Sequence, residues 1–193
     1  MSLDWDRIER WQPLLEQGEV SELRDLFGAA GARGPGVKWR PEPADLSQRQ
    51  AKFALAHWLG AASDGVPSLR IVDPVALAPA LGYLMIVEVV DGARDVIYRL
   101  IGTNLIAVSG FDMTRKRLSE HPMSSYIRDY SMALYRAVIA RREPVWSHHG
   151  PAVAVATAAW ERVILPLADD TGAIVRFLVA AVPIGLNGEA LRA

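Results

Sequence analysis

The chain has 193 residues, 51% of them hydrophobic and 22% charged, and its 21 basic and 22 acidic side chains give a formal net charge of −1. This length suffices to bury a core, and the near-neutral charge lacks the excess of Lys and Arg that sequence-independent nucleic-acid binding requires. Because the sequence has no cysteine, no secretory-signal pattern at its start and no apolar run of the ~20 residues that a membrane span needs, we expect a cytoplasmic protein without disulfides, thiolate metal sites or membrane contacts.

The first 45 residues are expected to form an N-terminal helical extension and a linker. Apolar residues at helical spacing between Leu3 and Phe27, interrupted near Gly18, predict two short helices. Glycine and proline are dense between Gly28 and Pro43, which predicts a linker without regular structure. We therefore divide the chain into an extension with its linker (1–45), one domain (46–184) and a frayed tail (185–193).

An amphipathic helix from Leu46 to Ala62 is expected to open the domain, because its apolar residues recur every three or four positions. Leu46, Phe53 and His57 lie away from that apolar stripe. We expect these three residues to form a homodimer interface while the stripe packs on the domain itself. A second, shorter helix is predicted from Asp73 to Leu81, with Gly82 as its C-terminal cap.

Runs of β-branched residues and turn signals predict five strands in two groups. The strands are expected at Tyr83–Val90, Val96–Thr103, from Val145, at about Trp160–Leu167 and at Ala173–Pro183. Asp91-Gly92 and the loop 169–172 are hairpin signals. Between the groups, a short helix is predicted to end at Gly110, and a long helix to run from Ser124 or Ser125 to about Arg142.

This element order predicts an α+β fold, with one five-stranded antiparallel sheet covered on one face by helices. Pro166 conflicts with a central strand because proline cannot donate to a ladder. We therefore expect a bulge or an outward-facing position there.

The order and the amino-acid sequences of three segments resemble those of the PAS sensor domain, and more narrowly those of a bacterial single-PAS family of mostly uncharacterised proteins. The matching segments are Tyr98–Thr103, Gly110–Thr114 with Leu118 after it, and Glu161–Leu167, which together span about Leu46 to Val182. At Arg115 the chain departs from the pattern, since a small residue or glycine is expected there in relatives.

The resemblance implies a five-stranded sheet and helices that enclose a pocket for a small molecule, a haem or a flavin, or that pack without one. It implies no catalytic residues, and the sequence does not identify a cofactor. Light-sensing flavin chemistry is excluded because it needs a cysteine. We expect the pocket to be lined by polar and aromatic residues: Asn104, Ser109, His121, Tyr126, Tyr130 and Trp160.

Several residues are of types that bind metals or catalyse acid-base reactions, but we interpret them as structural or solvent-exposed. His148 and His149 are adjacent, so in a strand they point to opposite faces and cannot easily bind one ion; we interpret them as part of a partly exposed loop. Glu161-Arg162 and Asp169-Asp170 resemble charge pairs for acid-base work, but we interpret them as structural or solvated charges. We expect no metal site.

The leading functional hypothesis is a non-enzymatic sensor or regulatory module that forms a homodimer, binds a small molecule or a protein, and acts through a separate output partner. A pure interaction module with a packed core is the alternative, which a structure without a void larger than a water would favour. A small isomerase or hydrolase is a third hypothesis, which predicts a buried Asp or His in the pocket.

Overall fold

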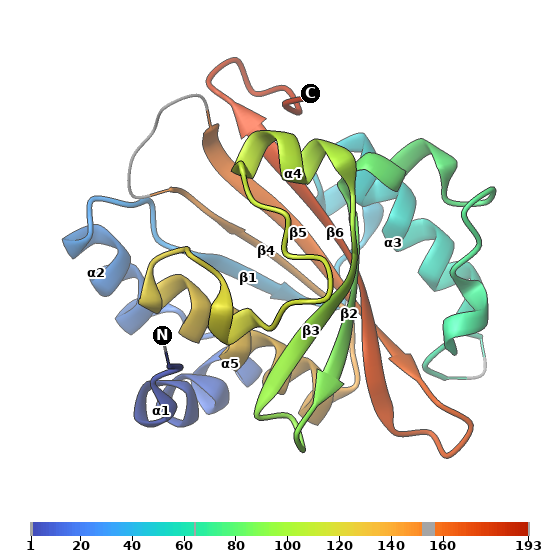
Figure 1. The fold of residues 1–193 in the computed structure, drawn as a ribbon, viewed down its shortest axis with the longest axis horizontal. Helices are drawn as coiled ribbons and strands as arrows, with labels where there is room; N and C mark the ends of the chain where they lie inside the picture. Colours follow the sequence, from blue (N-terminus) through green and yellow to red (C-terminus); the bar gives the residue numbers. More distant parts are fainter. Residues whose placement is uncertain (1, 64, 152–156, 193) are drawn as a thin grey trace.

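The computed structural model describes residues 2–63, 65–151 and 157–192, and its centre is one antiparallel sheet (Figure 1). The strand order is β1-β4-β5-β6-β2-β3. The strands are β1 (Gly36–Trp39), β2 (Leu84–Val90), β3 (Asp95–Ile101), β4 (Val145–His149), β5 (Thr157–Ala168) and β6 (Ile174–Gly185). The α-helices are α1 (Trp5–Glu16), α2 (Ser21–Ala29), α3 (Arg49–Ala61), α4 (Thr103–Ser109) and α5 (Ser125–Arg141). The α+β class is confirmed, as are the five strands expected after residue 46.

Helices cover both faces of the sheet, not one as expected from the sequence. Figure 1 shows α1, α2 and α5 on one side and α3 on the other. The alternation along β5 explains the two layers: Ile164 belongs to the cluster of α1, α2 and α5, while Val163 and Leu165 belong to the cluster of α3. We call these the α5 face and the α3 face.

The segment expected as a linker contains a sixth strand, so that prediction is wrong at Gly36–Trp39. β1 pairs with β4 and forms one edge of the sheet. Gly36 permits this approach, because a Cβ at that position would lie 2.4 Å from the His148 ring. The pairing is with a partner more than 100 residues away, which local glycine and proline density cannot reveal.

The N-terminal helices are part of the main core. Ile8, Trp11, Leu23 and Phe27 are fully or almost fully buried in the same cluster as the residues of α5. Arg7 also donates a 2.7 Å hydrogen bond to the buried carboxylate of Asp129 on α5. The expected division of the chain at the linker therefore does not coincide with a division of the core.

Helix α3 packs on its own sheet through the predicted apolar stripe, including Leu55 and Trp58. The interface role expected for Leu46 is corrected, because Leu46 is only 2% exposed and belongs to the same core cluster. Phe53 is half-buried against this cluster, and His57 makes a 2.8 Å hydrogen bond to the Ile71 carbonyl.

Pro166 pairs with Phe177 of β6, and the ladder shifts register just beyond it, between Leu167 and Ala168. β4 begins at Val145, which pairs with Ile164, so no described strand lies beside Pro166 on that side. The Pro166 carbonyl accepts a 2.8 Å hydrogen bond from the indole of Trp58, so its backbone points away from β6. The missing N–H of proline therefore removes no hydrogen bond from the ladder.

The junction between β3 and α4 is the tightest part of the fold. Gly102 donates to the Leu84 carbonyl at 2.8 Å, and a Cβ on it would lie 2.4 Å from the backbone of Gly82. α4 ends as predicted at Gly110, whose φ of 75° is left-handed. Arg115, where a glycine was expected in relatives, also has a left-handed φ, of 66°.

Two local predictions are wrong. Residues 74–77 form a turn, and a 3-10 helix follows at Ala78–Tyr83, so no α-helix runs from Asp73 to Leu81. The tail is not frayed over residues 185–192: the Leu191 N–H donates to the Pro183 carbonyl, and the Leu191 carbonyl accepts from the Tyr83 hydroxyl, both at 2.8 Å. Tyr83 lies 108 residues away from Leu191 in the chain, so no local pattern predicts this contact.

Candidate functional site

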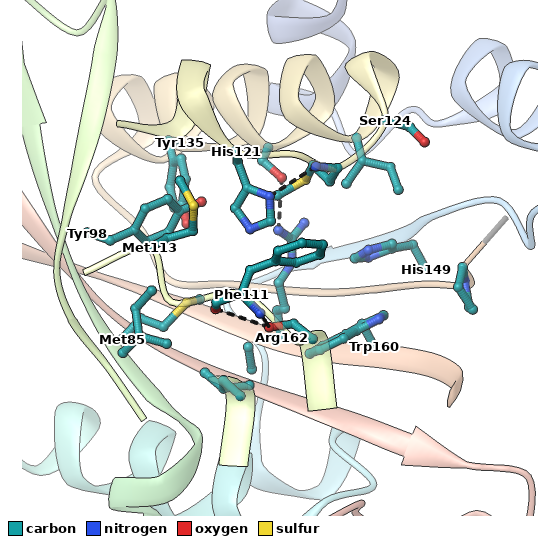
Figure 2. A pocket seen from close by; sticks show the side chains of 18 residues that line it. Met85, Tyr98, Phe111, Met113, His121, Ser124, Tyr135, His149, Trp160 and Arg162 are labelled. Atoms are coloured by element: carbon teal, nitrogen blue, oxygen red, sulfur yellow. Dashed lines mark hydrogen bonds between the residues drawn. The ribbon is translucent and has the colours of Figure 1, made fainter. Parts of the chain in front are cut away.

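A cavity of about 330 Å³ lies between the α5 face of the sheet, α4, α5 and the loops that follow α4. Figure 2 shows its side chains converging from these elements. The volume is at the lower end of the ~300–1,000 Å³ of ordinary ligand pockets. The lining residues are Met85, Tyr98, Ile101, Leu105, Ser109, Phe111, Met113, His121, Met123, Ser124, Ile127, Ser131, Tyr135, His149, Pro151, Trp160, Arg162 and Ala181.

Arg162 is the central polar group of the cavity. It projects from β5 toward α5 (Figure 2) and is only 7% exposed. Its Nη1 donates to the Ser131 hydroxyl at 3.1 Å, and its Nε donates to the Ser147 hydroxyl at 3.4 Å. The guanidinium also lies 5.3 Å from the centre of the Tyr130 ring. Its Nη2 has no hydrogen-bond partner among the described residues.

The neighbouring acid does not neutralise this arginine. Glu161 is buried on the α3 face, where its carboxylate accepts hydrogen bonds from the backbone N–H groups of Ser47 and Gln48 and from the Trp146 indole, at 2.7–3.0 Å. Residues 161 and 162 point to opposite faces because they are adjacent in a strand. Of the two interpretations given for this pair, solvated charges are excluded, because both side chains are buried.

His121 lies over the cavity in the loop before α5. The Met123 N–H donates to its Nδ1 at 3.1 Å, so the neutral ring carries its proton on Nε2. Arg128 ties this loop down by donating to the carbonyls of His121 and Met123, at 3.0 and 2.5 Å. Burial, together with the nearby charge of Arg128, lowers the pKa of His121 to about 4.

His149 ends β4 and faces the cavity, while His148 points to the α3 face and stacks on Trp146. The two rings thus point apart as expected, but they lie in a strand and His149 is buried, which corrects the expected exposed loop. Burial, and then the charge of Arg162, lowers the pKa of His149 well below its usual value. Near neutral pH the imidazole is therefore uncharged.

The rest of the wall is apolar or aromatic. Burial raises the pKa of Tyr135 to about 12 and that of Tyr98 well above its usual value, so both phenols stay protonated. Phe111 is 45% exposed and lies within ring contact of His121 at 6.1 Å, at the rim of the cavity. Arg162 is thus the one side chain among the described lining residues that is charged near neutral pH.

A comparison with protein families matches residues 47–181 to the PAS domain. The match covers more than half of the chain and includes β2 to β5 and most of β6. The chain belongs to the PAS domain family. PAS domains are sensory and regulatory modules and are generally non-enzymatic. No curated protein and no solved structure matches this chain.

The PAS cavity brings together three of the six residues expected to line it: Ser109, His121 and Trp160. The other three lie elsewhere. Asn104 lines a surface groove beside Gly82 and the C-terminal tail. Tyr126 packs edge-on against Phe27 of the N-terminal helices, and Tyr130 is fully buried between Phe27 and the Arg162 guanidinium. Helices α1 and α2 thus occupy the side of α5 where these tyrosines were expected to meet a ligand.

Sequence reasoning missed Arg162, and a signal for it was present. Trp160 was expected in the cavity, and Arg162 follows it by two residues in the same strand, so the two must share a face. An arginine inside an otherwise apolar strand is itself unusual, because arginine is almost never fully buried without a partner. The signal was missed because Glu161 stands next to Arg162 in the sequence, and the two were interpreted together as a charge pair.

Within the described ranges, no three His, Asp or Glu side chains gather closely enough to hold a metal ion. No described helix is long and apolar enough to cross a membrane.

Proposed function

We propose that this PAS protein is a sensory module that binds a small molecule in the cavity and acts through a separate output partner. The observation that carries the proposal is the cavity itself, a partly open space of about 330 Å³ with mainly apolar walls and one buried charge. Such a combination is typical of ligand sites, where a few polar groups orient a ligand in an apolar pocket.

The same cavity counts against the two other hypotheses. A pure interaction module predicts a packed core, and the space here is far larger than the ~30 Å³ share of a water in the liquid. An enzyme predicts a buried Asp or His, and His121 and His149 do line the cavity. However, among the described lining residues no carboxylate is present to orient either histidine, so the nucleophile–histidine–carboxylate arrangement of a hydrolase triad is absent there.

A signal can leave the cavity through the loops that close it. His121 and Phe111 lie in loops next to α4 and α5, and ring contacts at 6.1–6.2 Å connect these two residues and Tyr98 of β3. A ligand that displaced Phe111 would therefore move a partly exposed side chain at the surface. We propose that an output partner recognises this surface.

We also propose that the protein forms a homodimer through the outward side of α3. Ala56, Leu59 and Gly60 are exposed there, next to the half-buried Phe53. Sedimentation of the protein at twice the monomer mass would agree with the proposal, and sedimentation as a monomer would contradict it.

The ligand part is tested by filling the cavity. Ala181 lies on β6 with its side chain in the cavity, so Ala181→Leu places three more carbon atoms in the ligand space. We expect native mass spectrometry of the isolated protein to detect a bound small molecule in the wild type and none in Ala181→Leu. Ala107→Leu, at an exposed position of α4, is the matched control and should keep the ligand.

The proposal fails if the wild-type protein carries no ligand and no small molecule from a metabolite library raises its melting temperature. It also fails if Ala181→Leu, folded by circular dichroism, binds the ligand as well as the control does.

A further inference from the structure

We infer that the ligand is a small monocarboxylate with an apolar or aromatic body, and that its carboxylate binds the guanidinium of Arg162. This inference rests on the proposed function, because it names the class of ligand that the same cavity would take. Its basis is the unpaired positive charge in the cavity, together with what surrounds it.

Among the residues that the structure describes, the charge of Arg162 has no acidic partner. No Asp or Glu is among the described lining residues, and the nearest acid along the chain, Glu161, is saturated by donors on the other face. The segment 152–156, which the structure does not describe, consists only of Ala and Val and so carries no carboxylate side chain. The net charge of the described lining residues near neutral pH is therefore +1.

Burying such a charge is costly unless an anion and hydrogen bonds compensate for it. Two serine hydroxyls and the face of Tyr130 compensate only in part, because they carry no negative charge. They also hold the guanidinium in place while its Nη2 stays without a partner. A carboxylate is the natural complement, because its two oxygens match the N–H groups of a guanidinium.

The anion should carry one negative charge. The two histidines in the wall are neutral near pH 7, because burial lowers the pKa of both. Arg128, the other buried arginine nearby, is engaged with the carbonyls of His121 and Met123 and does not line the cavity. A second negative charge, as on phosphate or a dicarboxylate, would be buried without compensation.

The remainder of the ligand should be apolar. Around Arg162 the wall is formed by aliphatic, thioether and aromatic side chains, among them Met85, Ile101, Leu105, Met113, Tyr135 and Trp160. These side chains offer few hydrogen bonds, so a sugar or an amino acid with several polar groups would lose more hydration than it regains.

The test compares acids with their neutral amides by isothermal titration calorimetry on the full chain. Phenylacetate and hexanoate probe aromatic and aliphatic bodies, and phenylacetamide and hexanamide are matched controls without charge. We expect at least one acid to bind, and to bind at least about tenfold more tightly than its amide, as is typical of a hydrogen-bonded charge. Inorganic phosphate and phthalate should bind more weakly than that acid.

Arg162→Met removes the charge and keeps an unbranched side chain. This variant should lose at least about tenfold in affinity for the acid, approaching the affinity of the amide. Without ligand it should melt at or above the wild-type temperature, because an uncompensated buried charge has been replaced by an apolar group. Arg176→Met is the matched control: Arg176 pairs with Glu88 on the α3 face, so this variant should bind like the wild type.

Several outcomes would overturn the inference. These are equal binding of acid and amide, full affinity in Arg162→Met, tighter binding of phosphate or phthalate, or no binding of either acid. A neutral molecule identified by mass spectrometry in the isolated protein would also overturn it, while the proposed sensory function would stand. Failure of the cavity-filling test, in contrast, would remove both.

Discussion

Glu161 and Arg162 are neighbours in one strand, yet their charges are compensated very differently. Three N–H groups donate to Glu161 and fix the start of α3 against the sheet, so this carboxylate has a structural role. Arg162 has two weak neutral acceptors and one Nη2 without a partner. Buried groups of this second kind are rare in proteins and often indicate function.

At the same scale, His121 predicts how stability depends on pH. Its pKa is about 4 in the folded protein, against an ordinary value of 6.5, because burial and Arg128 disfavour the charged ring. At a pH between these two pKa values, His121 is protonated in the unfolded chain and neutral in the folded protein. The free energy of unfolding should therefore fall as the pH drops from about 6.5 to about 4.

Urea unfolding across this pH range measures the effect. His121→Asn keeps an acceptor near the position of Nδ1 for the Met123 N–H but has no titratable ring. Its stability should change less with pH than that of the wild type. An identical pH dependence in both proteins would contradict the pKa shift assigned to His121.

At the scale of elements, the β3–α4 junction depends on the absence of a side chain at Gly102. A Cβ there would lie 2.4 Å from the carbonyl carbon and oxygen of Gly82, which are backbone atoms that cannot rotate away. Gly102→Ala should therefore lower the free energy of unfolding by about 1–3 kcal/mol, measured by urea denaturation. Because α4 bounds the cavity, the same variant should also weaken ligand binding.

Gly28→Ala is the control of opposite sign. Gly28 lies within α2, and a Cβ on it would meet nothing within 4 Å. Since alanine favours a helix over glycine, this variant should gain about 0.5–1 kcal/mol. If Gly102→Ala were as harmless as Gly28→Ala, the junction would not be as tight as the structure indicates.

At the scale of the whole molecule, residues outside the matched PAS region complete the core. β1 extends the sheet at β4, and α1 and α2 cover α5, so the apolar side of α5 that faces away from the sheet is also buried. A helix buried around most of its circumference has no solvated face to reveal its orientation. This is why the expected ligand roles of Tyr126 and Tyr130 differ from their observed contacts with Phe27.

Trp11→Ala tests whether α1 is integral to the fold. The Trp11 ring is 1% exposed, and its indole donates to Glu22 at 3.1 Å. Removing so large a buried side chain should cost about 3–5 kcal/mol of unfolding free energy, measured with urea. Glu9→Ala, at an exposed position of the same helix, should change stability by less than about 0.5 kcal/mol. Equal effects would mean that α1 is a dispensable appendage.

Local sequence patterns predicted the positions of most helices and strands, but they did not predict which segments pack against each of them. The ends of α4 and α5, the strands β2 to β6 and the positive φ of Gly172, at 84°, all follow from signals within a few residues. Three of the six residues expected in the pocket line the cavity, because alternation and turn positions specify a face of an element. They do not specify which element covers that face, as Asn104 and Leu46 illustrate.

The sequence by itself determined the α+β class, the PAS resemblance and the exclusion of thiol chemistry, since these depend on composition and local order. Only the tertiary structure decided that β1 joins the sheet, that helices cover both of its faces, and that Arg162 is buried in the cavity with no acidic partner among the described residues. The physical reason is that burial and charge compensation depend on contacts between distant segments. Glu161 and Arg162 are adjacent in the chain, but the sheet between them separates their environments.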